Sequence, residues 1–436
     1  MDAAVDPWEG SVTALVSRPL APPARAIPRA QIDPRRLGAH PAADRAGPID
    51  LGCAHRILAV RPDNLGDVVL LTPALRALRA AAPARARLDL LATPAGAAVG
   101  PLLDSVDEVV EVPSVSWQDA AGETFDPQAQ LALIRRLAAG GYDLAVIFTS
   151  SSQSPWPAAF VCACAGIPIR AGASREFGGS LLTHWTDALP EGLHQADRAL
   201  ALLSRFGVPT DQADRRLELR LPPDASTAAR RELGAFPAGA PYAVLLPGAS
   251  CPSRRYPAHR FAVVAELLAG AGLRVVVAGT AREAELVEQV RAGADRTPSG
   301  PADPSSAGEA SPSVGLAGSL TVPELAALLR GAAVVVTNNS GGAHLADAVR
   351  APVVILFAGT EREAEYQPRA GTGTLLRRPT ACSPCRAFVC AYQQECLDIP
   401  PAQVAAAALR LVPRRAIPSR PARGDRPGSA RPGSAR

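Results

Sequence analysis

Residues 56–81 of the chain read RILAVRPDNLGDVVLLTPALRALRAA. The opening segment RILAV predicts a short buried strand, and the spacing of apolar residues over about 67–81 predicts a helix. Between them, Gly66 permits a tight turn and Asp67 begins the helix. A buried strand that leads through a short turn into a helix is the repeating unit of a parallel sheet, so this stretch predicts an α/β fold.

The same alternation of strands and helices continues in two series. Strands of the first series are expected at RLDLLAT, DEVVEV and DLAVIFT, and strands of the second at YAVLLPG, RVVVAGT, VGLAG, AVVVTNNS and PVVILFAG. Helices are expected at 195–206, 260–270, 321–330 and 402–411. Two series joined near residue 225 predict two tandem Rossmann-like domains whose parallel sheets face each other across a cleft, with ligands bound at the carboxyl ends of the strands.

The composition of the remaining segments suggests the domain limits. Residues 1–54 are rich in Pro, Ala, Arg and Asp and are expected to form a disordered extension. The domains are expected at 55–225 and 226–412, with a flexible loop at 293–313 in the second. Residues 413–436 are expected to be a disordered basic tail, which could contact an anionic membrane surface or simply be solvated.

The overall composition narrows the class of protein. A formal net charge of +4 over 436 residues does not argue for nucleic acid as a partner. The segment MDAAVDPWEG lacks an apolar core, and no apolar run approaches the roughly 20 residues that cross a bilayer. We therefore expect a soluble cytoplasmic protein, and we expect a monomer. None of the 45 basic residues is a lysine, so an arginine at a given position says little about a preference over lysine.

Asp67 is a candidate for acid–base chemistry. A carboxylate that projects into the cleft at the end of the first strand could accept a proton from an acceptor hydroxyl. The same residue could instead cap the helix that it begins and complement the helix dipole. The residue by itself leaves both interpretations open.

Two loops of the second series suit a diphosphate. In the first, a turn of small residues ends at Ser250, and Arg254 follows shortly after it; backbone N–H groups and a fixed positive charge together bind phosphate. The second is NNSGGAH (338–344), in which paired glycines allow close approach of the backbone and Ser340 can donate a hydrogen bond. His344 could bind the ligand or pack on the face of the helix, and both interpretations stay open.

Three segments together resemble glycosyltransferase family 9, the ADP-heptose:lipopolysaccharide heptosyltransferases. They are ILAVRPDNLGDVVLLTPALRALR, LPGASCPSRRYPAHRF and TNNSGGAHLADAVRAPVVILFAGT, in the order and with the separations of the family. The resemblance covers roughly residues 55–412. It implies the GT-B fold, an inverting reaction, and no catalytic metal or other cofactor. It also implies a nucleotide diphosphate sugar as donor, ADP-heptose first of all, and a saccharide or glycolipid acceptor such as lipopolysaccharide core.

The resemblance also implies roles for individual residues. The catalytic aspartate of the family falls on Asp67. Its phosphate-binding basic residue falls on Arg254, with Tyr256 where the family has tryptophan. The remaining donor contacts that it implies fall on Asn339, Ser340, Gly341 and His344, and on Glu283 beside the nucleotide ribose, just after Thr280. Gly342 is a candidate diphosphate contact from the paired glycines and Thr280 a candidate nucleotide contact.

Other functions and other contacts remain open on the sequence. A nucleotide-sugar 2-epimerase on the same architecture would convert donor without an acceptor, and a non-catalytic relic would bind donor and never release nucleotide diphosphate. Acceptor contacts are expected on the loops 113–127, 150–157 and 170–180, the last of which carries Arg170 and Arg175.

Four cysteines gather near the carboxyl end of the second domain, in the spacing Cys-x2-Cys-x4-Cys-x5-Cys. In a reducing cytosol such a cluster suggests metal binding or plain packing before it suggests disulfides. A structural zinc ion, packed or unpaired thiols, and disulfides all stay open for this cluster, which consists of Cys382, Cys385, Cys390 and Cys396.

Overall fold

The computed structural model describes residues 47–413 apart from 113–123, 152, 177–180, 188, 297–312 and 372. The basic tail, most of the expected extension at 1–54 and most of the expected loop at 293–313 lie outside the described residues. Within the described part of the chain, none of the helices has the length and apolar character that crossing a bilayer requires.

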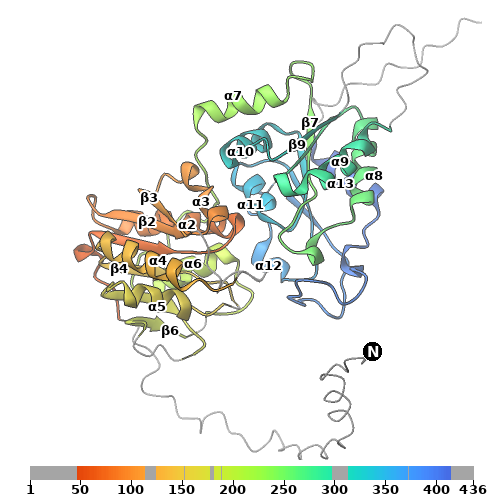
Figure 1. Cartoon of the computed structure of the whole chain (residues 1–436). Coiled ribbons are helices and arrows are strands. Elements are labelled where there is room, and N and C mark those ends of the chain that lie inside the picture. The colour runs from red at the N-terminus through yellow and green to blue at the C-terminus, as the bar shows by residue number, and fades with distance from the viewer. Residues whose placement is uncertain are drawn as a thin grey trace, which may run out of the picture. The chain divides into compact units, whose positions relative to one another are not determined.

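Two parallel sheets of six strands each form the framework of the described residues (Figure 1). The first has the order β3-β2-β1-β4-β5-β6 and the second the order β12-β11-β10-β7-β8-β9. The strand order reverses between β1 and β4 in the first sheet and between β7 and β10 in the second. In open α/β sheets, ligands bind at such a switch point. The strands are β1 Arg56–Val60, β2 Arg87–Ala92, β3 Glu108–Glu111, β4 Leu144–Ile147, β5 Ile169–Ala173, β6 His184–Thr186, β7 Tyr242–Leu246, β8 Arg274–Gly279, β9 Ser313–Ala317, β10 Val334–Asn338, β11 Val353–Leu356 and β12 Gly373–Leu376.

Helices connect the strands as crossover segments. Short 3₁₀ turns accompany them, including η2 Leu51–Cys53, η4 Pro252–Arg254 and η5 Ala281–Glu283. The α-helices are α2 Leu65–Ala81, α3 Pro94–Ala97, α4 Pro127–Gly140, α5 Trp156–Cys164, α6 Gln195–Arg205, α7 Pro223–Glu232, α8 Ala258–Gly270, α9 Ala284–Ala294, α10 Val322–Gly331, α11 Gly341–Ala348, α12 Glu363–Tyr366 and α13 Pro401–Leu411.

Each sheet is buried on both faces, which explains why its strands are runs of apolar residues. In β1, Ile57 and Ala59 belong to a core with α2 and α6, while Leu58 and Val60 face a second core with α4 and α5. The second sheet repeats this arrangement, with α10 and α11 on one face and α8, α9 and α13 on the other. Side chains alternate between the faces of a strand, so strands covered on both faces are apolar along most of their length.

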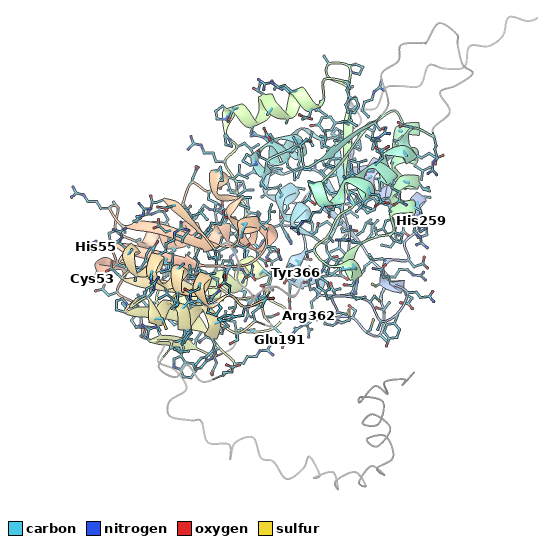
Figure 2. The ribbon with its side chains drawn as sticks, viewed as in Figure 1. Cys53, His55, Glu191, His259, Arg362 and Tyr366 are labelled. Atoms are coloured by element: carbon cyan, nitrogen blue, oxygen red, sulfur yellow. The ribbon has the colours of Figure 1, made fainter. Side chains whose placement is uncertain are left out.

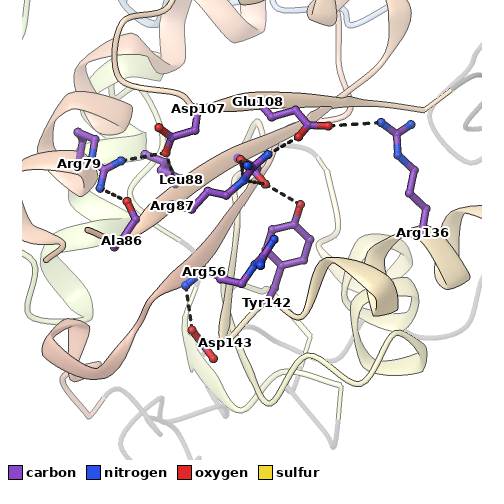
Figure 3. Close-up of polar contacts among 11 residues, drawn as sticks. Arg56, Arg79, Ala86, Arg87, Leu88, Asp107, Glu108, Arg136, Tyr142 and Asp143 are labelled. Carbon is purple, nitrogen blue, oxygen red and sulfur yellow. Dashed lines mark hydrogen bonds and ion pairs between the residues drawn. The ribbon is translucent and has the colours of Figure 1, made fainter. Parts of the chain in front are cut away.

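A polar cluster at the β2–β3 side of the first sheet shows how a buried charge is accommodated (Figure 3). Asp89 on β2 is buried and accepts hydrogen bonds from the Nε of Arg87 at 2.9 Å and from the hydroxyl of Tyr142 at 2.9 Å. Arg87 also pairs with Glu108 on β3, and Arg136 lies 4.0 Å from the same carboxylate. Because the buried carboxylate has partners, this cluster is structural.

The structure confirms the two α/β series but shifts several of the expected limits. Helix α2 begins two residues before the expected start, and α7 spans the expected connection near residue 225. Residues 49–54 were expected in the disordered extension, yet Ile49 is buried and its N–H donates to the carbonyl of Phe206 at 2.9 Å. Strands β5, β6 and β12 were not predicted, and β5 occupies part of the segment expected to be an acceptor loop.

Candidate functional site

The carboxyl end of β1 holds a buried arginine between two aspartates. Arg61 is 4% exposed, its Nε lies 3.0 Å from the carboxylate of Asp63, and its NH2 group donates to Oδ1 of Asp67 at 2.8 Å. The same NH2 group donates to Ser150 at the end of β4, at 2.8 Å. Arg61 therefore spans the switch point of the first sheet and fixes the position of Asp67.

Asp67 keeps one carboxylate oxygen available. Its Oδ1 is held by Arg61, while no contact to Oδ2 is found among the described residues, and the side chain is 22% exposed. Helix α2 has Asn64 at its N-cap and no side-chain cap, so Asp67 sits in the first turn without capping the helix. An anchored carboxylate with a free oxygen is suited to accept a proton from a bound hydroxyl.

The starts of α2 and α11 approach each other closely. A Cβ atom on Gly66 would lie 3.0 Å from the Cα of Gly341 and 3.0 Å from the ring of His344, so a glycine is needed at this contact. His344 is 8% exposed, and burial lowers the pKa of its imidazole to about 4. His344 is therefore neutral near pH 7, packed 6.0 Å from the ring of Tyr366.

Arg254 lies in η4 and is held by the loop that follows β11. Its Nε donates to the hydroxyl of Thr360 at 3.1 Å, and its NH2 group pairs with the carboxylate of Glu361. Asn339 donates to the other oxygen of Glu361 at 3.3 Å and accepts from the N–H of Ala358 at 3.0 Å. Burial raises the pKa of Glu361 to about 7, although the charge of Arg254 opposes this rise.

A cavity of about 1020 Å³ opens at the carboxyl ends of β7, β8 and β9. Its polar wall contains six of the residues predicted for the donor, and its apolar wall is formed by Leu286, Leu316, Leu320, Val322 and Leu325. The six are Ser250, Thr280, Glu283, Ser340, Gly341 and Gly342. A half-apolar cavity of this size is suited to a nucleotide.

Glu283 is oriented by its neighbours in this cavity. One oxygen accepts from both the N–H and the hydroxyl of Thr280 at 2.9 Å. The other oxygen points toward Gly248, where a Cβ atom would lie only 2.1 Å away. Ser340 is the N-cap of α11 but makes no capping hydrogen bond, so its hydroxyl and the first N–H groups of the helix are available to an anion.

The remaining predicted donor residues do not line this cavity. Arg254 borders a smaller cavity of about 170 Å³ together with Ser151, Glu361 and Tyr366. The two cavities lie on either side of the β10–α11 turn, because Ser340 lines the first and Asn339 contacts Glu361 in the second. Tyr256, at the position of the expected tryptophan, is a core residue: it is 1% exposed and its hydroxyl donates to the carbonyl of Ile399 at 2.6 Å.

The two candidate acceptor arginines have partners within the first unit. Arg170 donates from its Nε to the carbonyl of Leu181 at 2.6 Å and from its NH1 group to the carbonyl of Ile167, so it fastens the ends of β5 and β6 together. Arg175 pairs with Glu191 at 2.8 Å, and Glu191 also lies 3.2 Å from Arg362 of the second unit (Figure 2). Arg175 is 54% exposed and is linked through Glu191 to Arg362 of the second unit.

The cysteine cluster lies beside the loop that holds Arg254. Among the described residues, which include all four cysteines of the cluster, no group of three or more His, Cys, Asp and Glu could hold a metal ion. None of the four thiols is paired in a disulfide, and burial together with the nearby Cys390, Cys382 and Cys385 raises the pKa of the Cys396 thiol. The backbone of the segment binds the loops that hold Arg254: the N–H of Cys385 donates to Gly359 at 3.0 Å and that of Arg386 to Thr360 at 2.9 Å.

Sequence reasoning missed three residues of the site. Glu361 follows the expected strand at 352–359, so the rule that ligands bind at strand ends could have identified it. Arg61 stands directly after the first strand, but its charge gave no indication that it would be buried between two aspartates. Asn338 is fully buried and donates to the carbonyl of Pro247 at 2.7 Å, which joins the ends of β10 and β7.

Solved glycosyltransferase structures share this architecture. The chain is similar to the Escherichia coli ADP-heptose lipopolysaccharide heptosyltransferase II, with a TM-score of 0.63, 23% identity, and coverage of 82% of this chain and 98% of that one. It is also similar to a glycosyltransferase family 9 protein of Veillonella parvula, with a TM-score of 0.65, 20% identity, and coverage of 84% and 99%. The two tandem Rossmann-type units are thus the GT-B fold.

Residues 130–395 match glycosyltransferase family 9 (heptosyltransferase). The lipopolysaccharide heptosyltransferase 3 of Escherichia coli K12 is 28% identical over 304 residues, which are 68% of this chain and 80% of that protein. The chain belongs to glycosyltransferase family 9 and is a glycosyltransferase. The family match begins after Asp67, so the role of that residue depends on the geometry at β1.

Proposed function

We propose that this glycosyltransferase moves heptose from ADP-heptose to a hydroxyl of a saccharide, glycolipid or lipopolysaccharide-core-like acceptor, with inversion at the anomeric carbon and without a catalytic metal. One observation carries the proposal. The cavity that holds the candidate nucleotide contacts is also lined by Asn64 and Leu65, in the turn of α2 that carries Asp67. A nucleotide bound there directs its diphosphate and sugar toward the carboxylate.

Asp67 is the general base of the proposed reaction. Its free oxygen removes the proton from the acceptor hydroxyl as the hydroxyl oxygen forms a bond to the anomeric carbon. The bond from that carbon to the donor phosphate oxygen breaks on the opposite face, and the nucleotide diphosphate leaves with the electron pair. Arg61 keeps the carboxylate in place during this step, since it binds Oδ1 and leaves Oδ2 free.

The leaving diphosphate gains negative charge as the bond breaks. Arg254 supplies a positive charge, and Ser250, Ser340 and the first N–H groups of α11 supply hydrogen bonds and the positive end of a helix dipole. His344 is neutral before the donor binds and can donate one hydrogen bond from its ring. These groups belong to the chain and are in place before the reaction, which is the condition for effective electrostatic stabilisation.

The nucleotide contacts fit a base and a ribose. Leu286, Leu316 and Leu320 provide an apolar surface for the base, and Glu283, fixed by Thr280, can accept hydrogen bonds from two ribose hydroxyls. The similar Escherichia coli enzyme is described as using ADP-heptose, which supports ADP-heptose as the first donor to test here. For the acceptor, Arg175 is the better candidate of the two arginines because Arg170 is committed to backbone carbonyls. We place the enzyme in the cytoplasm as a monomer, in peripheral contact with a membrane that presents the acceptor.

A donor screen tests this function. The protein is incubated with ADP-heptose and with ADP-, UDP-, GDP- and dTDP-hexoses, with and without acceptor and EDTA, and nucleotide diphosphate and sugar products are followed. We expect acceptor-dependent release of ADP from ADP-heptose that EDTA does not reduce. Conversion of a donor to its epimer without acceptor would instead identify a 2-epimerase, and binding without any release would identify a non-catalytic protein.

A further inference from the structure

Glu361 is an acidic residue at a site that must bind an anion. Its side chain is 18% exposed, and its two oxygens are bound by Arg254 and by Asn339. Both partners were predicted from the sequence to contact the donor. In the donor-free protein, therefore, a carboxylate of the chain already occupies the residues that are expected to serve the donor.

The surroundings of Glu361 are rich in further acids. Asp67 on α2 and Glu365 on α12 both raise the pKa of Glu361 by repulsion, and burial raises it more strongly than either. Tyr366 on α12 and His344 on α11 lie near the same group of charges and are neutral near pH 7, because burial raises the pKa of the phenol and lowers that of the imidazole. The remaining positive groups that border the small cavity beside Arg254 are Arg362 and Arg386.

A diphosphate cannot simply be added to this arrangement. The negative charge of the diphosphate is stabilised little by Arg254, because a buried carboxylate already neutralises the arginine. The same carboxylate repels the diphosphate. Two of the three guanidinium nitrogens of Arg254 are engaged, the Nε by Thr360 and NH2 by Glu361, while no contact to NH1 is found among the described residues. The diphosphate can approach at NH1, and its binding becomes favourable once Glu361 loses its charge.

The geometry points to Glu361 as a stand-in anion that holds Arg254 in the donor-free enzyme and takes up a proton when the diphosphate binds. This inference rests on the proposed function only in its assignment of the donor diphosphate to Arg254. Glu361 is a positioning residue: it keeps the guanidinium oriented through Arg254 and Asn339 and does not contact the reacting atoms. The proton comes from solvent, and it is returned when the nucleotide diphosphate leaves.

Binding of ADP to the full-length protein tests the inference without any transfer reaction. Calorimetric titrations compare wild type and Glu361→Gln near pH 6 and pH 8. At about pH 8 we expect Glu361→Gln to bind ADP about tenfold more tightly, because the wild-type carboxylate is ionised and competes for Arg254. Near pH 6 the two proteins should agree within about twofold, since Glu361 with a pKa of about 7 is then mostly protonated. Taking the ratio of the two proteins at each pH cancels the titration of ADP itself, whose terminal phosphate has a pKa near 6.

Two controls isolate the contact. Glu363→Gln removes a carboxylate from the adjacent helix α12. Because the partner of Glu363 is Arg377, this variant should bind ADP as wild type does at both pH values. In an Arg254→Ala background, the additional change Glu361→Gln should have little effect, because the group that the two anions share is gone.

A measurement on wild type alone covers the case in which Glu361→Gln fails to fold. Binding enthalpies near pH 8 in two buffers of different ionisation enthalpy should reveal uptake of a substantial fraction of a proton, at a pH where the phosphates of ADP are already ionised. Equal or weaker binding by Glu361→Gln at pH 8, or no proton uptake by wild type, overturns the inference while leaving the proposed function intact. Failure of wild type to bind any of ADP, UDP, GDP and dTDP would overturn both.

Discussion

The NH2 group of Arg61 lies 2.8 Å from Oδ1 of Asp67 and equally close to the hydroxyl of Ser150. This buried guanidinium joins the ends of β1 and β4 and sets the orientation of the candidate base. Because Asp63 holds its other side at 3.0 Å, Arg61 compensates two carboxylates at once. The position of Asp67 is thus determined by a residue that has no contact with substrate in the proposed reaction.

Replacing Arg61 with methionine should destabilise the fold strongly. The change leaves Asp63, whose side chain is 9% exposed, without a charged partner, a situation that typically costs about 3–5 kcal/mol. Urea unfolding measures the loss. Arg215→Met is the matched control, since Arg215 is 51% exposed in its pair with Asp197 and should contribute at most about 1 kcal/mol. Similar stabilities for the two variants would show that the Arg61 cluster is not an essential buried ion pair.

Arg254→Ala should lower kcat/KM by about 100- to 1000-fold, because the leaving diphosphate loses a fixed positive charge. Arg254→Lys should retain part of the activity, since it keeps the charge but loses the fork that binds Thr360 and Glu361. Arg378→Ala changes an exposed arginine that pairs with Asp398 and serves as the control. Near-normal kinetics for Arg254→Ala would remove this residue from the donor site.

Gly248→Ala should weaken nucleotide binding with a smaller effect on the chemical step. The new methyl group would collide with Glu283, whose carboxylate oxygen lies 2.1 Å from the position of the Cβ atom. Glu283 would have to turn away from the ribose, so the KM for donor should rise about tenfold, the value for loss of about 1.4 kcal/mol. Gly47→Ala is the control because no atom lies within 4 Å of its Cβ position. An unchanged KM would argue against the assignment of Glu283 to the ribose.

Burial of His344 should make stability depend on pH. Burial lowers its pKa from 6.5 to about 4, so between these values the unfolded chain binds a proton that the folded chain does not. The neutral imidazole therefore contributes fully to the free energy of unfolding above about pH 6.5. This contribution is lost as the pH falls toward 4, by about 3 kcal/mol in total. Urea unfolding of wild type and His344→Gln across this range should show wild type losing stability relative to the variant. His259→Gln, at an exposed position, is the control, and parallel curves for wild type and His344→Gln would contradict the burial of a neutral imidazole.

Local patterns predicted the framework well because most of the buried strands are runs of mainly apolar residues. The runs RILAV and VVVTN needed no knowledge of the rest of the chain. Strand β5 was missed since IRAGA has few bulky apolar residues, and β12 is only half-buried, so neither produces a clear hydrophobic pattern. These two strands are defined by pairing with β4 and β11, a property of the folded sheet that sequence spacing does not reveal.

The site was predicted unevenly for a similar reason. Ser250 and Ser340 were predicted because they follow strands, and Glu283 was implied by the family resemblance; all three line one cavity. The ion pair of Arg254 with Glu361 joins residues 107 positions apart, and no local motif indicates such a contact. Zinc and packed thiols both stay predictions for the cysteine cluster, because spacing describes the chain, whereas a metal site depends on how the thiols converge in space.

The most direct test of the account is the turnover of Asp67→Asn with the donor identified by the screen. The amide keeps the size of the side chain and can still be held by Arg61, but it cannot accept the proton of the acceptor. We expect kcat to fall by about 100- to 10,000-fold while ADP binds with wild-type affinity within about threefold. Turnover near that of wild type, with ADP affinity unchanged, would contradict the assignment of Asp67 as the base and with it the proposed mechanism.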